Sequence, residues 1–258
     1  MKVDKFRTVI IYIIIILLGL VCLLPLLNIV AISFSSSAAV EGNMVGLIPV
    51  GFSTAAYEKI LEDSQFWHSF LISVERVVLT LIINFVLIVL MAYPLSKTNA
   101  QFRGRNIYAN LMIFAMLFNG GMIPTFLLVK SYGLLNTVWA LVLPGAVPIF
   151  NVILVMNFFA AVPKELEEAA FIDGANPLQV LTKIFIPISK PVLATVSLFS
   201  IVGSWNDFYS GLIYMSKAAY YPLMTYIQSL QINVEDLIKQ GNLSAVVDSA
   251  SLGNTNLN

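Results

Sequence analysis

The sequence predicts an all-α protein that crosses a membrane several times. Apolar residues make up 59% of its 258 residues and charged residues only 11%, whereas a soluble globular domain has about 25% charged residues. The few charges are clustered, and the uncharged stretches between the clusters are long enough to cross a bilayer. Together these two observations define a polytopic membrane protein built from helices.

The same composition excludes other classes of protein. An ordinary soluble enzyme needs more polar surface than this chain supplies. Cys22 is the single cysteine, which excludes a disulfide scaffold. Fourteen basic and fourteen acidic residues give a net charge of zero, so nothing indicates a nucleic-acid partner.

The first uncharged stretch covers 9–32 and follows three basic residues. A signal peptide begins in a similar way, but its apolar part is shorter than this stretch, and no small-residue cleavage site follows here. Pro25 lies inside the stretch, which a membrane helix tolerates. We therefore expect a first membrane span over 9–32.

Four further spans follow in order. Uncharged stretches predict the second span at about 72–95 and the third at about 107–129. The stretch 131–163 exceeds one span, and we place the fourth at about 137–160, where it contains Pro144 and Pro148. The fifth, at about 191–215, contains one acidic residue, Asp207.

The basic residues predict the orientation of these spans. Nine of them fall on one side, before the first span, between the second and third, and between the fourth and fifth. By the positive-inside rule that side is the cytoplasm. The amino terminus is then cytoplasmic, and the loops 33–69 and 216–258 are extracytoplasmic. The nine residues are Lys2, Lys5, Arg7, Lys97, Arg103, Arg105, Lys164, Lys183 and Lys190.

The cytoplasmic loop 163–189 has strong helix signals. Pro163 and the acidic residues after it suit the first turns of a helix. Gly174 can adopt a left-handed conformation and end that helix. Asn176 and Pro177 are typical of the cap and first residue of a second helix. The loop is therefore predicted to form a helix, a glycine turn and a second helix.

On these signals alone the loop could simply be a solvated connection between two spans. Its residues, however, closely resemble the EAA loop of permeases in ABC importers. The resemblance is carried by Glu168-Ala169-Ala170, by Asp173-Gly174-Ala175, and by Ile184, Ile186 and Pro187 at fixed spacing. Leucine is commoner in that family at the position of Ile186. The segments 118–124 and 205–208 resemble the carbohydrate-uptake branch, related to the maltose-type inner permease and closest to permeases for oligosaccharides and polysaccharide fragments.

The resemblance covers essentially the whole chain and implies a single transmembrane permease domain over 1–258 in the cell membrane. It implies a type I importer in which a second permease subunit, two cytoplasmic ATPases and an extracytoplasmic solute-binding protein are partners. Such permeases have a sixth span after a polar external loop, so we expect that the sixth span is missing from this chain. The implied ATPase-coupling residues are Glu168, Ala169, Ala170, Asp173, Gly174, Ala175, Ile184 and Pro187.

Two of these residues have an alternative role. Glu168 and Asp173 offer carboxylates to basic groups of an ATPase, or they cap backbone amides of their own loop. We favour the partner role for Glu168 and the capping role for Asp173, because Asp173 precedes the turn glycine.

A second group of residues is a candidate for the substrate path. Asp207 lies about 24 Å along the fifth span from Pro191, near the outer edge of the hydrocarbon core, and ionisable residues at such positions often face a cavity. Its neighbours are aromatic or hydrogen-bonding, as in sugar sites. The alternative is an interfacial aromatic belt with a hydrated acid beside it. The candidate residues are Asn119, Trp205, Asn206, Asp207 and Tyr209.

The sequence predicts no chemistry of the chain's own. It contains no nucleotide-binding P-loop motif, and His68 is its single histidine, so we predict no catalytic residue, no metal site and no cofactor. The main rival interpretation is a secondary transporter of a small polar solute, which commonly has repeated halves and buried coupling charges. The loop 33–69 is either a surface for the binding protein or a structural lid.

Overall fold

The computed structural model describes residues 5–118 and 120–239, and within them every regular element is a helix. The chain divides into two compact units on either side of the Phe66–Trp67 bond. In the described residues two helices are long and apolar enough to cross a membrane, and three bent helix pairs raise that number to as many as five. The predicted all-α membrane fold is confirmed.

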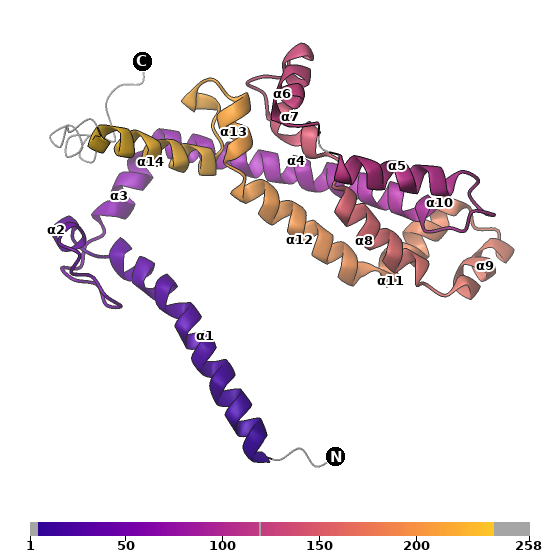
Figure 1. Ribbon diagram of the computed structural model, residues 1–258, viewed down its shortest axis with the longest axis horizontal. Helices are drawn as coiled ribbons and strands as arrows, with labels where there is room; N and C mark the ends of the chain where they lie inside the picture. The colour runs from indigo at the N-terminus through magenta and orange to yellow at the C-terminus, as the bar shows by residue number, and fades with distance from the viewer. Residues whose placement is uncertain (1–4, 119, 240–258) are drawn as a thin grey trace. The chain divides into compact units, whose positions relative to one another are not determined.

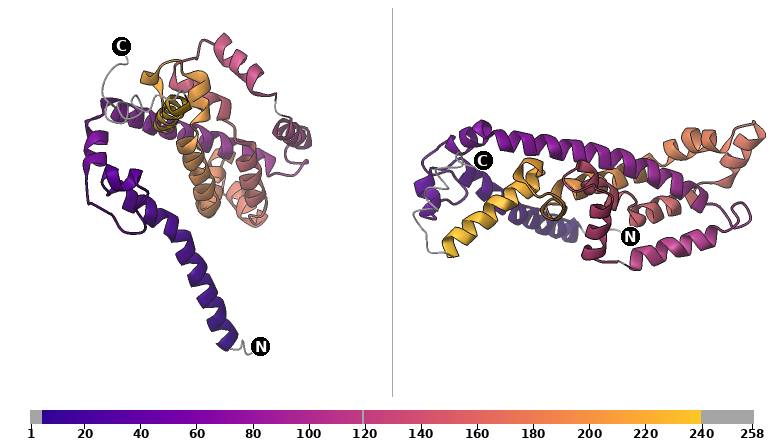
Figure 2. Two further views of the ribbon diagram at one scale, coloured as in Figure 1. Left: turned by 60° about the vertical axis from the view of Figure 1, so that its left-hand side comes forward. Right: turned by 90° about the horizontal axis from the view of Figure 1, so that it is seen from above.

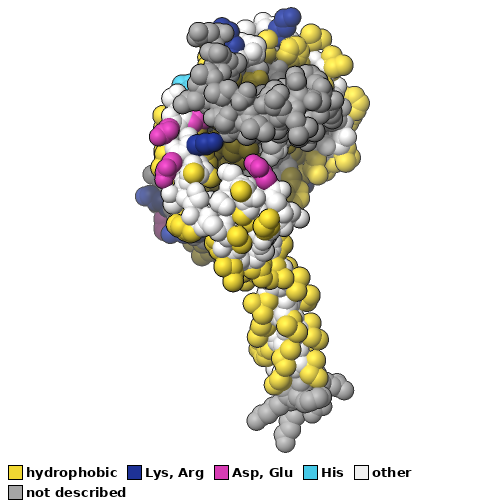
Figure 3. Space-filling model, turned by 90° about the vertical axis from the view of Figure 1, so that its left-hand side faces the viewer, with side chains coloured by type: hydrophobic (Ala, Val, Ile, Leu, Met, Phe, Trp, Pro, Cys, Tyr) yellow, Lys and Arg dark blue, Asp and Glu magenta, His cyan; other side chains and the backbone are white. Residues whose placement is uncertain are grey.

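The first unit contains α1 (Lys5–Ser33), an uninterrupted helix that includes Pro25. Its side chains from Val9 to Val30 are apolar almost all round and exposed, as Figure 3 shows for the hydrophobic atoms along the helix. A helix that is apolar on every face requires a lipid or protein environment around it. The predicted span 9–32 coincides with the candidate span Thr8–Ser33.

Two short helices follow in the same unit, α2 (Ser37–Glu41) and α3 (Ala55–Glu62). The loop between them turns back beside the last turns of α1 (Figure 1). Thr54 precedes α3, and its hydroxyl donates to the Glu58 carboxylate at 2.7 Å instead of capping a backbone amide.

The second unit is organised along α4 (Ser64–Leu95), most of which belongs to it and which contains the predicted span 72–95. One face of α4 buries a row of polar side chains at helical spacing, followed by apolar ones. The polar residues are Ser69, Ser73, Arg76, Thr80 and Asn84. Buried polar groups need partners, and those of Ser73, Arg76 and Asn84 come from segments far along the chain.

The third and fourth predicted spans are each broken into two helices. The third consists of α5 (Arg105–Leu117) and α6 (Met122–Ser131), and Gly121 at the start of α6 has a φ of +90°. The fourth consists of α7 (Val138–Val142), the 3₁₀ turn η1 (Leu143–Gly145) and α8 (Ile149–Ala160), with a bend of 47°. Pro144 and Pro148 lie in and beside this break, because proline supplies no amide hydrogen to a continuing helix.

The loop predicted over 163–189 contains α9 (Lys164–Ile172), α10 (Pro177–Val180), the π-helical turn η2 (Leu181–Phe185) and α11 (Ile186–Ile188). It leads into α12 (Lys190–Asn206), which is bent by 84° from the preceding helical segment.

The predicted fifth span over 191–215 is not one continuous helix. The helix ends at Asn206, and α13 (Tyr209–Tyr214) begins after a break at Asp207. The segment 216–258, predicted as a loop, contains η3 (Ala218–Tyr220) and α14 (Leu223–Lys239). The remainder of that predicted loop, and with it the expectation about the sixth span, lies outside the described residues.

The main core of the second unit lies where α4, α8, η2 and α12 meet. α8 and α12 run side by side in the left view of Figure 2. Its most deeply buried large side chain is Phe159 of α8, which makes an edge contact with Phe185 of η2 at 5.4 Å between ring centroids. This core fixes the position of the segment that follows α9.

Candidate functional site

The turn between α9 and α10 is built around Gly174, whose φ is +83°. The Ala175 amide donates to the Ala170 carbonyl at 2.9 Å, and the Gly174 amide donates to the Phe171 carbonyl at 3.1 Å. These bonds satisfy carbonyls at the end of α9, as is usual when a left-handed glycine ends a helix. The predicted glycine turn is confirmed.

The start of α10 is fixed by a reciprocal cap. The Asn176 side chain accepts from the Gln179 amide at 2.9 Å, and the Gln179 side chain accepts from the Asn176 amide at 2.9 Å. Pro177 occupies the first helical turn, where it leaves no hydrogen bond unmade. The turn and the start of the second helix are therefore both fixed by residues that are close together in the sequence.

After α10 the helix widens into the π-helical turn η2. Pro187 lies one residue into α11 and has no amide hydrogen to donate to the carbonyl four residues earlier. The local loss of that bond favours the wider turn, in which Leu181 and Phe185 point into the core.

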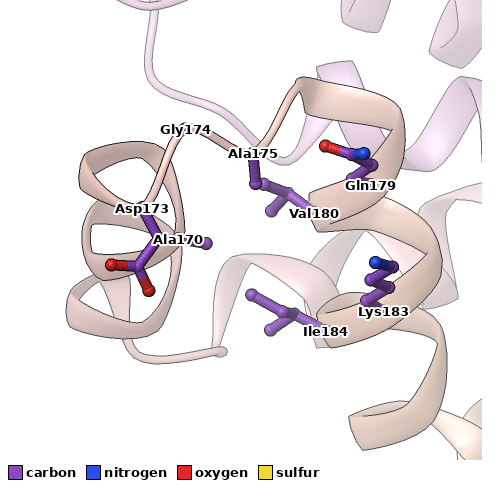
Figure 4. A pocket seen from close by; sticks show the side chains of 8 residues that line it. All are labelled: Ala170, Asp173, Gly174, Ala175, Gln179, Val180, Lys183 and Ile184. Atoms are coloured by element: carbon purple, nitrogen blue, oxygen red, sulfur yellow. The ribbon is translucent and has the colours of Figure 1, made fainter.

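A solvent-open pocket of about 520 Å³ lies between the two helices of this helix–turn–helix. Figure 4 shows the side chains of Ala170, Val180 and Ile184 directed into the gap between the two helices. Asp173 and Lys183 add one acidic and one basic group to the rim. The lining residues are Ala170, Asp173, Gly174, Ala175, Gln179, Val180, Lys183 and Ile184.

The predicted coupling residues divide between this pocket and its surroundings. Five of the eight, Ala170, Asp173, Gly174, Ala175 and Ile184, line it. Glu168 and Ala169 are exposed on α9, and Pro187 is exposed on α11. The Asp173 carboxylate is exposed and accepts no hydrogen bond from the described part of the chain.

Glu167, which the sequence interpretation did not single out, is the residue that ties α9 to the core. It is 8% exposed, and its carboxylate accepts from Lys97 Nζ at 2.7 Å and from the Tyr93 hydroxyl at 3.4 Å. Lys97 Nζ also lies 4.1 Å from the centre of the Tyr93 ring and 4.2 Å from that of Phe185. α9 is thus joined to the end of α4 by a shielded ion pair.

The surroundings of this pair perturb Lys97. Burial lowers the pKa of the Lys97 amine, and the hydrogen bond and charge of Glu167 act in the opposite direction without cancelling the effect. Glu167 and Ala170 share one face of α9, but no local spacing in the sequence indicates the pair, because Lys97 lies 70 positions from Glu167.

The second candidate group lies at the break between α12 and α13. Asp207 and Arg76 form an ion pair between carboxylate and Nη2, and Arg76 Nη1 also donates to the Asp207 carbonyl at 2.8 Å. The other carboxylate oxygen accepts from the Ser210 amide at 3.1 Å. Arg76 is 3% exposed. Asp207 therefore joins α4 to the break and caps α13.

The other residues of this group make separate contacts. Trp205 is half-buried, with its ring edge-on to Phe70 at 6.0 Å. Asn206 is exposed, and its side chain donates to the Val202 carbonyl at 2.9 Å. The exposed Tyr209 hydroxyl donates to Met122 Sδ at 3.0 Å. Asn119 lies outside the described residues.

Comparisons with known proteins identify the chain. A family described as "Binding-protein-dependent transport system inner membrane component" matches residues 77–247. The chain belongs to this family. The resemblance to importer permeases that the loop residues indicated is confirmed, and the family assigns the chain to the membrane as a transport component.

Individual relatives agree with this assignment. The chain is 42% identical to protein LplC of Bacillus subtilis, covering 83% of this chain and 72% of the relative. It is 39% identical to the polygalacturonan/rhamnogalacturonan transport system permease protein YtcP of the same organism, covering 93% and 83%. A solved structure of a bacterial ABC transporter involved in the import of the acidic polysaccharide alginate contains a chain with 34% identity and a TM-score of 0.81, covering 89% of this chain and 81% of that one.

Proposed function

We propose that the chain is the membrane-spanning subunit of an ATP-driven importer and that it forms, with a second permease, the pathway for an oligosaccharide. One observation carries the proposal: a chain of this family presents Glu168 and Ala169 on an exposed helix whose turn is fixed by a left-handed glycine. ATP hydrolysis then takes place on separate ATPase chains, which this helix contacts.

The saccharide part of the proposal is supported by the relatives. YtcP is named for polygalacturonan and rhamnogalacturonan, and the structurally similar importer is described with alginate. We infer that this chain carries oligosaccharides delivered by an extracytoplasmic binding protein. Uptake of galacturonan, alginate and neutral glucan fragments by cells that express the complete transporter would discriminate acidic from neutral substrates.

The coupling part is supported by the shape of the loop. Small side chains at Ala169 and Ala170 allow close approach of a partner backbone, and Glu168 is exposed on the same helix for a basic group of that partner. When the ATPases close on ATP, the docked helix moves as a lever, and the spans change between inward- and outward-facing states. The lever acts on the core through Glu167 and Lys97.

Replacing Gly174 tests the coupling role. Nothing lies within 4 Å of a Cβ built at Gly174, so Gly174→Val acts chiefly through its positive φ. We expect binding-protein-stimulated ATP hydrolysis and uptake to be lost from proteoliposomes while the chain remains in the membrane. Gly174→Asn is the matched control, because asparagine tolerates the left-handed region. Normal uptake by Gly174→Val would contradict the assignment of this loop.

We also propose that the amino terminus and the loop 163–189 lie in the cytoplasm and the loop 33–69 outside. In a Cys22→Ser background, single cysteines at Arg103 and Lys183 should react with an impermeant maleimide only in inverted vesicles. Reaction in right-side-out cells would reverse the orientation. Co-purification of an ATPase with the tagged chain tests the partner assignment separately.

A further inference from the structure

The loop between α2 and α3 exposes large apolar side chains to an unusual degree. Met44 is 68% exposed, Ile48 76% and Phe52 74%, whereas the apolar residues of the membrane span α1 do not exceed 62%. The stretch 42–57 contains no charged residue. An exposed apolar surface of this kind usually marks a site of contact with a protein or a membrane.

Hydrogen bonds hold this loop beside α1. The Asn28 side chain donates to the Val45 carbonyl at 3.3 Å and to the Gly46 carbonyl at 2.7 Å. Asn28 lies five residues before Ser33, the last residue of α1, so the loop returns roughly 7.5 Å along the helix from its end at about 1.5 Å per residue.

The position of Asn28 along the span gives the depth of the loop. Counted from Thr8, where the candidate span begins, Asn28 lies about 30 Å along the helix, which is about the thickness of the hydrocarbon core. The contact with residues 45–46 is therefore at the boundary between hydrocarbon and headgroups, and the apolar side chains around it are at that boundary too.

The second half of the loop is held to the segment that follows α1. The Ser36 amide donates to the Val50 carbonyl at 3.1 Å, the Val50 amide donates to Ser35 Oγ at 3.0 Å, and the Ser53 amide donates to the Phe34 carbonyl at 3.0 Å. The Phe34 ring stacks on Phe52 at 5.7 Å between centroids. These hydrogen bonds and the ring contact fix the position of the loop relative to the end of α1.

We propose that this loop is an interfacial membrane anchor, in which Met44, Leu47, Ile48 and Phe52 insert among the lipids of the leaflet where α1 ends. Its irregular backbone fits the headgroup boundary, because non-helical backbone exposed to lipid is not stable deeper in the core. Apolar side chains on an uncharged segment at this level gain free energy by leaving water, as in other interfacial elements. The proposal depends on α1 spanning the membrane and is independent of the transported substrate.

Spin labels report the depth directly. In a Cys22→Ser background, nitroxides are attached to Ile48→Cys and Phe52→Cys in the full chain, reconstituted with its partner subunits in phosphatidylcholine–phosphatidylglycerol nanodiscs. Labels at Ile16→Cys within α1 and at Glu62→Cys on α3 are the controls for a membrane and an aqueous position. We expect the ratio of oxygen to nickel-chelate accessibility at Ile48 and Phe52 to lie severalfold above that at Glu62 and below that at Ile16.

Two results would overturn the anchor. A ratio at Ile48 and Phe52 equal to that at Glu62 would place the loop in water. Protection of both labels from oxygen and nickel alike would mean that protein covers them, and if this protection appeared only with the binding protein, the loop would be a docking surface for that protein. A label at Ile16 that behaved as aqueous would instead refute the first span itself.

Discussion

Removing the positive charge of Lys97 should destabilise the protein strongly. In Lys97→Met the Glu167 carboxylate loses its 2.7 Å partner while its side chain stays about nine-tenths buried, since the side chains of the pair are 12% and 10% exposed. Breaking a buried pair by removing one partner costs about 3–5 kcal/mol. The residual exposure of both side chains favours the lower end, so we expect a loss of about 3 kcal/mol.

Replacing both partners should restore most of that loss. Lys97→Met with Glu167→Leu leaves no buried charge, and such apolar pairs are often about as stable as the ion pair they replace. The Met side chain also keeps contact with the Tyr93 and Phe185 rings that surround Lys97. We therefore expect the double variant to lie within about 1 kcal/mol of the wild type, far from the sum of the single losses.

The measurement is the free energy of unfolding by SDS titration in mixed micelles, followed by circular dichroism. Lys164→Met on the exposed side of α9 is the matched control and should change stability by less than about 0.5 kcal/mol. In the assembled transporter, the double variant should remain folded but lower the uptake per ATP hydrolysed, because the polar joint between α9 and α4 is gone. Wild-type stability of Lys97→Met would refute the inference that this pair holds α9.

Three further predictions concern the other end of α4 and its partners. Gly211→Ala should destabilise the protein by about 1–3 kcal/mol, because the added methyl would lie 2.8 Å from the Thr225 Cβ and Cγ2 atoms; an unchanged SDS midpoint would contradict that packing. Arg76→Leu should lower stability by less than the roughly 3 kcal/mol expected for Lys97→Met, because the Asp207 carboxylate that it leaves unpaired is 30% exposed; wild-type stability of Arg76→Leu would contradict the pairing. Trp205→Ala should lower oligosaccharide uptake while the ATPase still co-purifies, and wild-type uptake would remove this residue from the proposed path.

The spans could be predicted from sequence because the bilayer imposes a simple requirement on length and charge. The first two predicted spans correspond to single helices. The turn at Gly174 and the cap at Asn176 could also be predicted, since they depend on residues only a few positions apart. Turns and helix caps that depend only on neighbouring residues can therefore be predicted from the sequence.

The missed features depend on residues distant in the chain. The fifth span breaks at Asp207, where the carboxylate is held by Arg76, a partner separated by 131 positions. From the sequence Glu167 is one of several acids suited to a helix start, because its partner Lys97 lies 70 positions earlier. Charge alone could not indicate which of the acids on α9 turns inward.

The polar face of α4 has a consequence for how the protein is made. Ser73 accepts from the Leu223 amide, Arg76 binds Asp207, and the Asn84 side chain donates to Ser200. All three partners are synthesised more than a hundred residues after α4. During biosynthesis α4 therefore enters the bilayer with an arginine and an amide that have no partner yet. Arginine at the centre of a span opposes insertion by about 2.5–3.5 kcal/mol. Arg76 lies near one end of the predicted span 72–95, so its cost is smaller, and the long apolar remainder of α4 offsets it. The polar face of α4 therefore gains its last partner only when the chain has been made as far as Leu223.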